Sequence, residues 1–176
     1  RQVQRLRGAA RVAQKYIERP LLLSGGRKFD VRLYVLQCGW APGSVWMYSG
    51  MLLKLCSAPF ALKSSSLANP LAHLTNCAVQ KGAPPGAGPE AADLLWSSAR
   101  FEQWLLANGY GEGAWAERVF PAIAQVARAT FAAQPTAPAP TTASHQLEGG
   151  QRAASFEVFG LDVLLDESLR PWLLEV

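Results

Sequence analysis

The chain has 176 residues, enough for one ordinary domain, and with 49% hydrophobic and 17% charged residues it can bury a core. Its formal net charge of +4 suits an acidic partner or an anionic ligand but does not by itself indicate nucleic-acid binding. No apolar run approaches the roughly 20 residues that a membrane span needs, and the three cysteines have neither CxxC spacing nor a histidine at metal-binding spacing.

The first residues predict little regular structure beyond short pieces. Residues 1–13 are rich in arginine, have helix-forming composition and lack the apolar core of a signal peptide. Residues 12–17 are compatible with a strand, and the sequence at 18–20 is typical of a turn. A short apolar run at 21–23 leads into a glycine-containing loop, after which we expect a strand.

The strand expected from about Lys28 to Cys38 carries an unusual set of charges. Lys28, Asp30 and Arg32 alternate with apolar residues, so an extended strand presents all three side chains on one face. Because buried charges must be paired, this face suits a site that handles anions. The alternative is an exposed, salt-bridged edge strand.

The next residues predict two further strands. A turn at 41–43 and a strand at 44–48 complete a long hairpin with the charged strand. A strand at 51–56 places Leu52 and Lys54 on one face.

Between residues 57 and 133 the pattern changes to loops and helices. The composition of 57–70 indicates a loop, and 72–81 is a compact segment of polar and apolar residues. Helical spacing predicts amphipathic helices at 93–106 and 115–133, the second with a proline near its start. The predicted apolar stripes are Leu94, Leu95, Phe101, Trp104 and Leu105 in the first helix, and Val119, Phe120, Ile123, Val126 and Phe131 in the second.

Two segments, 82–92 and 134–152, are rich in glycine, proline, alanine or threonine, and we expect them to be flexible insertions. Strands return at 155–165 and 169–176, joined by a turn at 166–168. Strands at both ends with helices between them predict an α+β or α/β sheet domain.

Asp162 and Glu175 are single carboxylates within the last two apolar strands. If those strands pair antiparallel, the two carboxylates lie opposite each other. Facing carboxylates repel unless a cation lies between them, and Mg²⁺ prefers such oxygen ligands, so a metal–nucleotide site is one interpretation. The alternative is that each carboxylate pairs with an arginine or caps a loop.

Several motifs in this order resemble the tubulin-tyrosine-ligase family of the ATP-grasp superfamily. They are Gln14-Lys15-Tyr16-Ile17, Arg27-Lys28-Phe29-Asp30-Val31-Arg32, His73-Leu74-Thr75-Asn76 with Gln80-Lys81, Phe159-Gly160-Leu161-Asp162 and Trp172-Leu173-Leu174-Glu175-Val176. The resemblance implies that residues 1–176 are one catalytic domain truncated at both ends. It implies an α+β ATP-grasp fragment with a mainly antiparallel sheet and packed helices.

The activity that the resemblance implies is a ligase using ATP and Mg²⁺. ATP phosphorylates a carboxylate, and the amine of Tyr, Glu or Gly then displaces the phosphate to form an amide. The implied partners are the acidic C-terminal tail of tubulin and a free amino acid, with no nucleic acid or membrane. The implied location is the cytoplasm, at microtubules, including those of a cilium or flagellum. As a fragment, the chain alone is expected to be inactive.

The resemblance also implies roles for individual residues. Arg32 and Lys54 are the implied catalytic cations, and Lys54 stands where many relatives carry an arginine, so bidentate carboxylate recognition is lost there. We expect Lys28 and Arg32 to serve anions, with Asp30 positioning them. The implied nucleotide-binding residues are Gln14, Lys15, Tyr16, Ile17, Lys28, Asp30, Thr75 and Asn76, and the implied Mg²⁺ ligands are Asp162 and Glu175.

Two other functions remain open at this point. A non-catalytic tubulin-binding scaffold would keep the fold, but it would be free to lose the charged residues that this chain retains. An ATP-grasp ligase with a small-molecule substrate is less consistent with residues 73–76 beside the charged strand.

Overall fold

The structure of the chain is a computed structural model that describes residues 14–38, 44–83, 88–133 and 156–176. The expected helical tail at 1–13, the turn at 41–43 and the insertion at 134–152 lie outside the described residues. So does the middle of the insertion expected at 82–92, whereas its last two residues belong to a short 3-10 helix.

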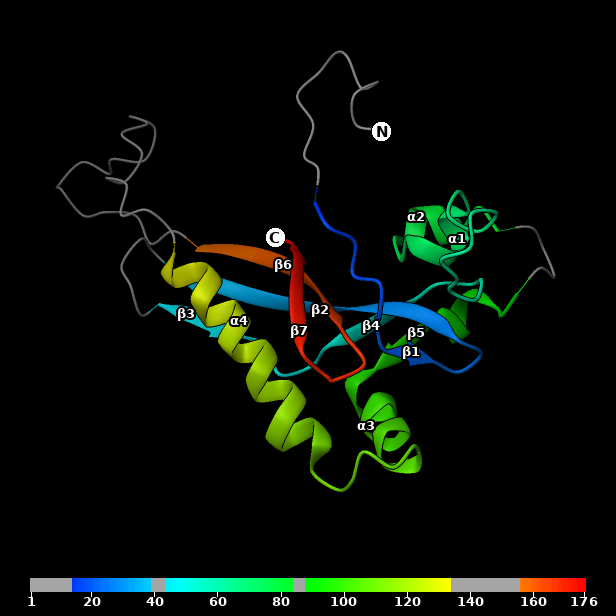
Figure 1. The fold of residues 1–176 in the computed structure, drawn as a ribbon. Helices are drawn as coiled ribbons and strands as arrows, with labels where there is room; N and C mark the ends of the chain where they lie inside the picture. Colours follow the sequence, from blue (N-terminus) through cyan, green and yellow to red (C-terminus); the bar gives the residue numbers. More distant parts are fainter. Residues whose placement is uncertain (1–13, 39–43, 84–87, 134–155) are drawn as a thin grey trace, which may run out of the picture.

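An antiparallel sheet forms the centre of the molecule (Figure 1). Its main path runs β5-β4-β2-β6-β7, with β1 and β3 paired to the two ends of β2. The strands are β1 (Leu22–Leu23), β2 (Arg27–Cys38), β3 (Val45–Met47), β4 (Leu52–Leu55), β5 (Leu95–Ser97), β6 (Phe156–Leu165) and β7 (Pro171–Glu175). The predicted hairpin is confirmed in its strand pairing, since β3 lies antiparallel to β2.

β2 is the central strand, and its alternating side chains give the sheet two different faces. Phe29 and Val31 are fully buried in the apolar core, whereas Lys28, Asp30 and Arg32 project to the opposite face. The predicted charged face is therefore confirmed. The edge-strand alternative is wrong, because β2 lies between β4 and β6 and both Lys28 and Asp30 are buried.

Two helices cover the apolar face, α3 (Ser98–Ala107) and α4 (Phe120–Ala132) (Figure 1). Phe101 of α3 packs on Phe29 of β2 with ring centroids 5.5 Å apart, which anchors the helix to the sheet. An α+β fold with a mainly antiparallel sheet and packed helices is confirmed. No helix within the described ranges is long and apolar enough to cross a membrane.

The helix predicted at 93–106 is wrong in its first part. Ala91–Leu94 form a 3-10 turn (η2), and the next three residues form β5, which pairs with β4 and buries Trp96. The helix begins only afterwards, because the Ser97 hydroxyl accepts a hydrogen bond from the Arg100 N–H (3.2 Å) and caps α3.

The helix predicted at 115–133 is confirmed, although its first part, Ala114–Val119, is a π-helical turn (η3). Proline stands in the first turn of α4, where its missing N–H is least costly. Within α4 the fully buried stripe passes through Ala127 rather than the neighbouring Val126.

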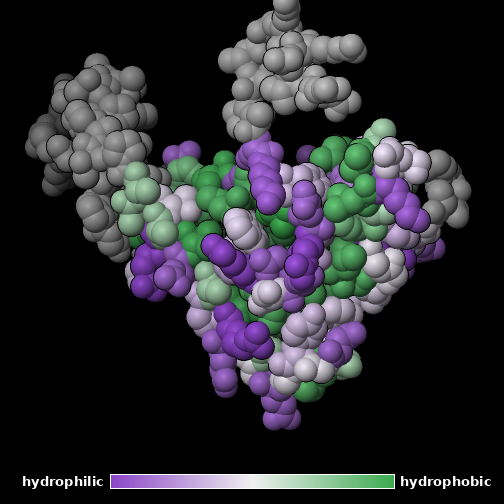
Figure 2. Space-filling view, in the orientation of Figure 1, coloured by the Kyte–Doolittle hydropathy of each residue, from purple (hydrophilic) through white to green (hydrophobic). Residues whose placement is uncertain are grey.

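The charged face lies on the other side of the sheet from α3 and α4. Two short helices, α1 (Pro70–His73) and α2 (Cys77–Gln80), and the segment 14–19 lie on this side (Figure 1). Residues 14–17 form no strand, so the strand expected at 12–17 is wrong in its described part. Figure 2 shows hydrophilic residues along the middle of this view, with hydrophobic residues on both sides.

Candidate functional site

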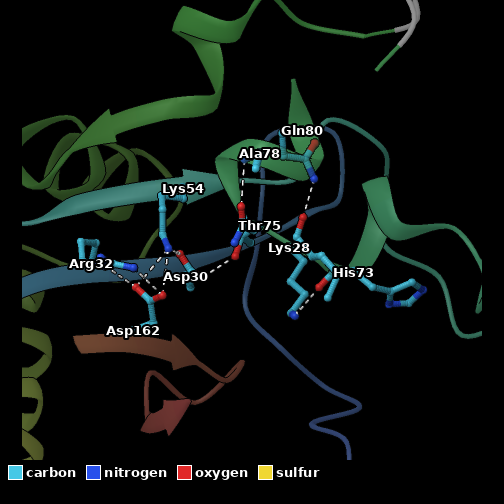
Figure 3. A network of polar contacts seen from close by, with 11 residues as sticks. Lys28, Asp30, Arg32, Lys54, His73, Thr75, Ala78, Gln80 and Asp162 are labelled. Atoms are coloured by element: carbon cyan, nitrogen blue, oxygen red, sulfur yellow. Dashed lines mark hydrogen bonds and ion pairs between the residues drawn. The ribbon is translucent and has the colours of Figure 1, made fainter. Parts of the chain in front are cut away.

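Asp162 of β6 receives hydrogen bonds from two cations, one on β2 and one on β4 (Figure 3). The sheet register places Arg32 directly opposite Asp162, and its Nε and Nη2 donate to the two carboxylate oxygens at 2.6 and 2.8 Å. Lys54 Nζ of β4 donates to both oxygens at 3.0 Å. A buried carboxylate held by a guanidinium fork and an ammonium is a strongly fixed group.

Asp30 continues this network across β2. One carboxylate oxygen accepts a hydrogen bond from the Thr75 hydroxyl, and the other lies 3.3 Å from Lys54 Nζ. That second oxygen is buried and accepts no hydrogen bond among the described residues, so it keeps acceptor capacity. The expectation that Asp30 positions Lys28 and Arg32 is wrong: its partners are Lys54 and Thr75.

Lys28 links the sheet to the segments above it. Its Nζ donates to the His73 carbonyl at 2.7 Å and lies 5.5 Å from the centre of the Tyr16 ring. His73 Nε2 faces the Ser66 carbonyl at 3.1 Å, so Nε2 donates there and Nδ1 accepts from the Tyr16 hydroxyl at 2.9 Å. Of the motif at 14–17, Tyr16 is thereby tied to the charged face.

Gln80 holds the loop that carries Thr75, a role that the sequence analysis did not assign. Its side-chain oxygen accepts from the Ser57 N–H at 2.8 Å, and its amide nitrogen donates to the Leu74 and Leu71 carbonyls at 2.5 and 3.3 Å. One buried amide therefore fixes α1 and α2 against the end of β4. The sequence does contain a signal for this role, because Gln80-Lys81 accompanies residues 73–76 in the family motif.

Gly160 belongs to one of the motifs, but the sequence analysis gave it no role of its own. A Cβ at this position would lie 2.8 Å from Arg32 Nη1, so the absence of a side chain leaves room for the guanidinium that pairs with Asp162. A single glycine inside a strand pattern is the kind of signal that marks such a close approach.

The β6–β7 hairpin brings Glu175 opposite Asp162, as the sequence predicted. Asp166 shapes the turn, because its Oδ1 accepts from the Ser168 and Arg170 N–H groups and its Oδ2 accepts from the Trp172 indole at 2.9 Å. Glu175 is exposed and forms no ion pair with the part of the chain that the structure describes. The alternative interpretation holds for Asp162, which pairs with an arginine.

Burial and pairing shift the titration of these groups in different directions. Burial lowers the pKa of Lys28 and raises the pKa of Asp30. Burial would also raise the pKa of Asp162, but the hydrogen bonds from Arg32 and Lys54 outweigh it and leave the pKa lowered. Asp162 is therefore a carboxylate at neutral pH.

Besides Glu175, four of the predicted residues lie outside this network. Gln14 and Lys15 are exposed and Ile17 is half-buried, and none of the three makes a side-chain hydrogen bond to a described residue. The Asn76 side chain accepts from the Ala78 N–H at 2.8 Å and caps α2. Their roles toward a nucleotide stay predictions.

A cavity of about 620 Å³ lies beside the network. Lys54 and Thr75 line it together with Gln80 and Lys81, and its size is typical of a site for a small molecule. The arrangement thus combines three cations, two buried carboxylates and an adjacent cavity, which suits binding of an anionic ligand.

The donor set suits Mg²⁺ only in part. Asp162 and Glu175 supply hard oxygens on paired strands, and Mg²⁺ is commonly held by one or two carboxylates together with substrate phosphates. The two Asp162 oxygens, however, already accept four hydrogen bonds from Arg32 and Lys54. Among the described residues there is no group of three or more His, Cys, Asp or Glu side chains that could hold a metal by itself.

Known proteins with similar sequences agree with the motifs. Tubulin monoglycylase TTLL3 of Danio rerio is 36% identical over 168 residues, covering 94% of this chain and 20% of that protein. Probable tubulin polyglutamylase TTLL9 of Bos taurus is 35% identical over 173 residues, covering 94% of this chain and 32% of that protein. Protein monoglycylase TTLL8 of Homo sapiens is 33% identical over 168 residues, covering 94% of this chain and 18% of that protein.

The chain thus spans between 18% and 32% of the length of these curated relatives. The model of the tubulin-tyrosine ligase family matches residues 3–176, nearly the whole chain. The chain therefore belongs to the tubulin-tyrosine ligase family.

Proposed function

We propose that this chain is part of an ATP-dependent ligase that joins an amino acid to a carboxylate of the tubulin C-terminal tail. The observation that carries the proposal is the buried network of Lys28, Asp30, Arg32, Lys54 and Asp162 beside a cavity. The relatives named as tubulin monoglycylase and tubulin polyglutamylase support tubulin as the acceptor.

The proposed reaction has two steps. An acceptor carboxylate oxygen attacks the γ-phosphorus of ATP, which gives an acyl phosphate and ADP. The amine of the incoming amino acid then attacks the acyl carbon, an amide bond forms, phosphate leaves and one proton is released. Both steps place negative charge near the protein, and fixed cations are what such transition states require.

The side chains in the network would divide this task. Arg32 is a permanent cation that Asp162 holds in one orientation, so it can meet a phosphoryl or oxyanion group without reorganising. Lys28 lies nearer to Tyr16 and the loop at 73–75, which supports a place for it at the nucleotide. Lys54 bridges both carboxylates and is the cation of the network that lines the cavity.

Mg²⁺ would be held by Asp162 and Glu175 and would neutralise charge on the transferred phosphoryl group. Arg32 and Lys54 each donate to both Asp162 oxygens, so a metal held by Asp162 would replace at least one of these hydrogen bonds, and the single ammonium of Lys54 can turn away more easily than the paired bonds of the guanidinium. Lys54 would then be free to turn toward an anionic substrate in the cavity.

The decisive experiment uses the longer protein that contains this chain, with tubulin, Mg-ATP and labelled Tyr, Glu or Gly in separate reactions. Incorporation of one amino acid supports the ligase and identifies its donor. Folded protein that binds ATP and incorporates none of the three would contradict the proposal and favour a tubulin-binding scaffold.

A variant sharpens this experiment. Glu175→Gln should abolish turnover while leaving the fold intact, because Glu175 is exposed and has no ion-pair partner among the described residues. Glu157→Gln is the matched control, since Glu157 is also an exposed strand carboxylate but lies far along β6 from Asp162. Full activity in Glu175→Gln would show that Glu175 is not a metal ligand.

A further inference from the structure

A second cavity adjoins the first one beside the end of β4. Its volume is about 530 Å³, and it lies between the β1–β2 turn, the segment that leads into η2, and the start of α3. Arg27 lines it, and because Arg27 precedes Lys28 on β2, the two side chains project to opposite faces. The two cavities adjoin, because Ser57, Gly88 and Pro89 line both, but their cations differ: Lys54 and Lys81 line the first, and Arg27 and Arg100 line the second.

Two arginines from different elements meet at this cavity. Gly25 and Gly26 both have positive φ, and they turn the chain so that Arg27 returns opposite Leu23. Arg100 comes from the first turn of α3, and its guanidinium lies 4.2 Å from the centre of the Trp96 ring. Stacking on the indole fixes the plane of that guanidinium and leaves its edge available for hydrogen bonds.

The cavity contains polar atoms without partners. Arg27 Nε and Ser57 Oγ are buried, and neither has a hydrogen-bond partner among the described residues. Ser57 is only 6% exposed, although it lines the cavity. Buried donors are normally satisfied, so two unpartnered donors on residues that line one cavity leave hydrogen-bonding capacity for an acceptor there.

The charges at the cavity also favour an anion. Neither Arg27 nor Arg100 forms an ion pair within the described ranges. One acidic residue, Asp93, lines the cavity, but its side chain makes no ion pair with either arginine, and its backbone carbonyl is used by the Trp96 indole at 3.1 Å. Ser24 adds a further hydroxyl at the rim.

We infer that this cavity binds a phosphate or carboxylate group through Arg27, Arg100 and Ser57. Guanidinium groups bind both kinds of oxyanion with paired hydrogen bonds, and the serine hydroxyl supplies a third donor. The site differs from the proposed ligase site in its cations, because Arg27 and Arg100 do not belong to the network of Lys28, Asp30 and Asp162, whereas Ser57 lines both cavities.

The test is a titration of the ¹⁵N-labelled 176-residue chain, observed at the Trp96 indole N–H. Inorganic phosphate and triglutamate are added in separate experiments at constant ionic strength, with chloride as the balancing anion. We expect a saturable shift with at least one of the two, and the tighter probe identifies the source of the oxyanion. A shift that fails to saturate with both probes would overturn the inference.

Variants separate this cavity from the charged network. Arg100→Gln should weaken binding about tenfold, the loss expected for one charge-assisted pair. Arg128→Gln removes an exposed arginine on α4 and is the charge-matched control, which should bind as the unmodified chain does. Equal affinities in these two variants would contradict the inference, and phosphate bound only at Lys28 and Arg32 would produce that result.

Ser57→Ala provides a second variant that does not depend on Arg100. Removal of an unpartnered buried hydroxyl should leave the melting temperature unchanged or raised, so loss of fold does not confuse the result. We expect about threefold weaker phosphate binding from the loss of one neutral hydrogen bond. Unchanged binding would remove Ser57 from the site and contradict the assignment.

Discussion

At the scale of single residues, the ion pairs of Asp162 fix the arrangement of the charged face and make the free energy of unfolding depend on each partner. Its carboxylate is buried with Arg32 and Lys54, and removal of one partner from a buried ion pair leaves the others without compensation. Asp162→Asn should therefore lower the free energy of unfolding by about 3 kcal/mol, near the low end for such pairs because Arg32 is partly exposed. Urea unfolding at pH 7 measures this change.

The difference in unfolding free energy between the unmodified chain and Asp162→Asn should change with pH in a definite direction. The pKa of Asp162 is below its ordinary value of 3.8 in the folded chain, so its contribution is present above that value and is lost as the pH falls through the folded pKa. The gap between the unmodified chain and Asp162→Asn should thus shrink below pH 3.8. Asp30 has the opposite sign, because a raised pKa makes protonation favour the folded state.

Asp30 is present in both the unmodified chain and Asp162→Asn, so its contribution to the pH dependence of stability cancels to first order in their difference. Glu102→Gln, at an exposed position of α3, removes a carboxylate without an ion pair among the described residues and should leave stability nearly unchanged. A gap that stays constant from neutral pH to pH 2 would show that folding does not lower the pKa of Asp162.

Gly160 tests how closely Arg32 is positioned. Gly160→Ala places a methyl group 2.8 Å from Arg32 Nη1, and the flexible end of that side chain can move while the strand stays in place. We expect the Arg32–Asp162 pairing to break and the melting temperature to fall, because Asp162 then keeps only Lys54 as a partner. The Arg32 Nε–H signal in an NMR spectrum, protected by its bond to Asp162, should become weak or exchange rapidly.

Val158→Ala is the control for this change, because Val158 is an exposed residue on the same strand and face. If Gly160→Ala keeps the Arg32 signal protected, the glycine is not needed for the ion pair.

At the scale of elements, the sequence predicted strands best where charge and apolar residues alternate. The strands β2 and β6 follow that pattern and were located within a few residues of their ends. β5 was missed because Leu94, Leu95 and Phe101 also fit a helical period, and only pairing with β4 makes Trp96 part of a strand.

The candidate site, too, could be predicted only as far as local sequence patterns determine it. The common face of Lys28, Asp30 and Arg32 follows from a period of two and could be predicted. Which carboxylate meets which cation depends on the register between β2, β4 and β6, and on the loop that brings Thr75 to Asp30. No local pattern encodes those long-range pairings.

The α1–α2 segment is held against the end of β4 by the hydrogen bonds of one side chain, that of Gln80. Gln80→Leu keeps the approximate size but leaves the Ser57 N–H and the Leu71 and Leu74 carbonyls without this partner. We expect a loss of about 2–4 kcal/mol in the free energy of unfolding, together with faster hydrogen exchange in residues 70–81.

Gln103→Leu is the matched control, since Gln103 is exposed on α3. It should change stability by less than about 0.5 kcal/mol, as is usual for surface sites. Equal effects of the two substitutions would mean that the Gln80 hydrogen bonds contribute nothing to the anchoring of this segment.

At the scale of the whole molecule, one apolar core joins the sheet to α3 and α4. Cys56 directly follows β4, is fully buried, and its N–H donates to the Lys28 carbonyl at 2.8 Å. Burial raises the pKa of its thiol to about 12, whereas Cys77 is exposed. At pH 8 iodoacetamide should therefore modify Cys77 rapidly and reach Cys56 only when the sheet opens.

This difference makes Cys56 a reporter of global opening, because its fully buried thiol reacts only through molecules in which the core has separated. Phe101→Ala removes a fully buried ring that packs on Phe29 and should cost about 3–5 kcal/mol. If the core opens as one unit, alkylation of Cys56 should accelerate by on the order of 10²–10³-fold, while Cys77 reacts as before. Leu106→Ala, at an exposed position of the same helix, should leave both rates unchanged. Peptide mapping by mass spectrometry gives both rates, and an unaltered Cys56 rate in Phe101→Ala would mean that α3 separates from the sheet without opening the end of β4.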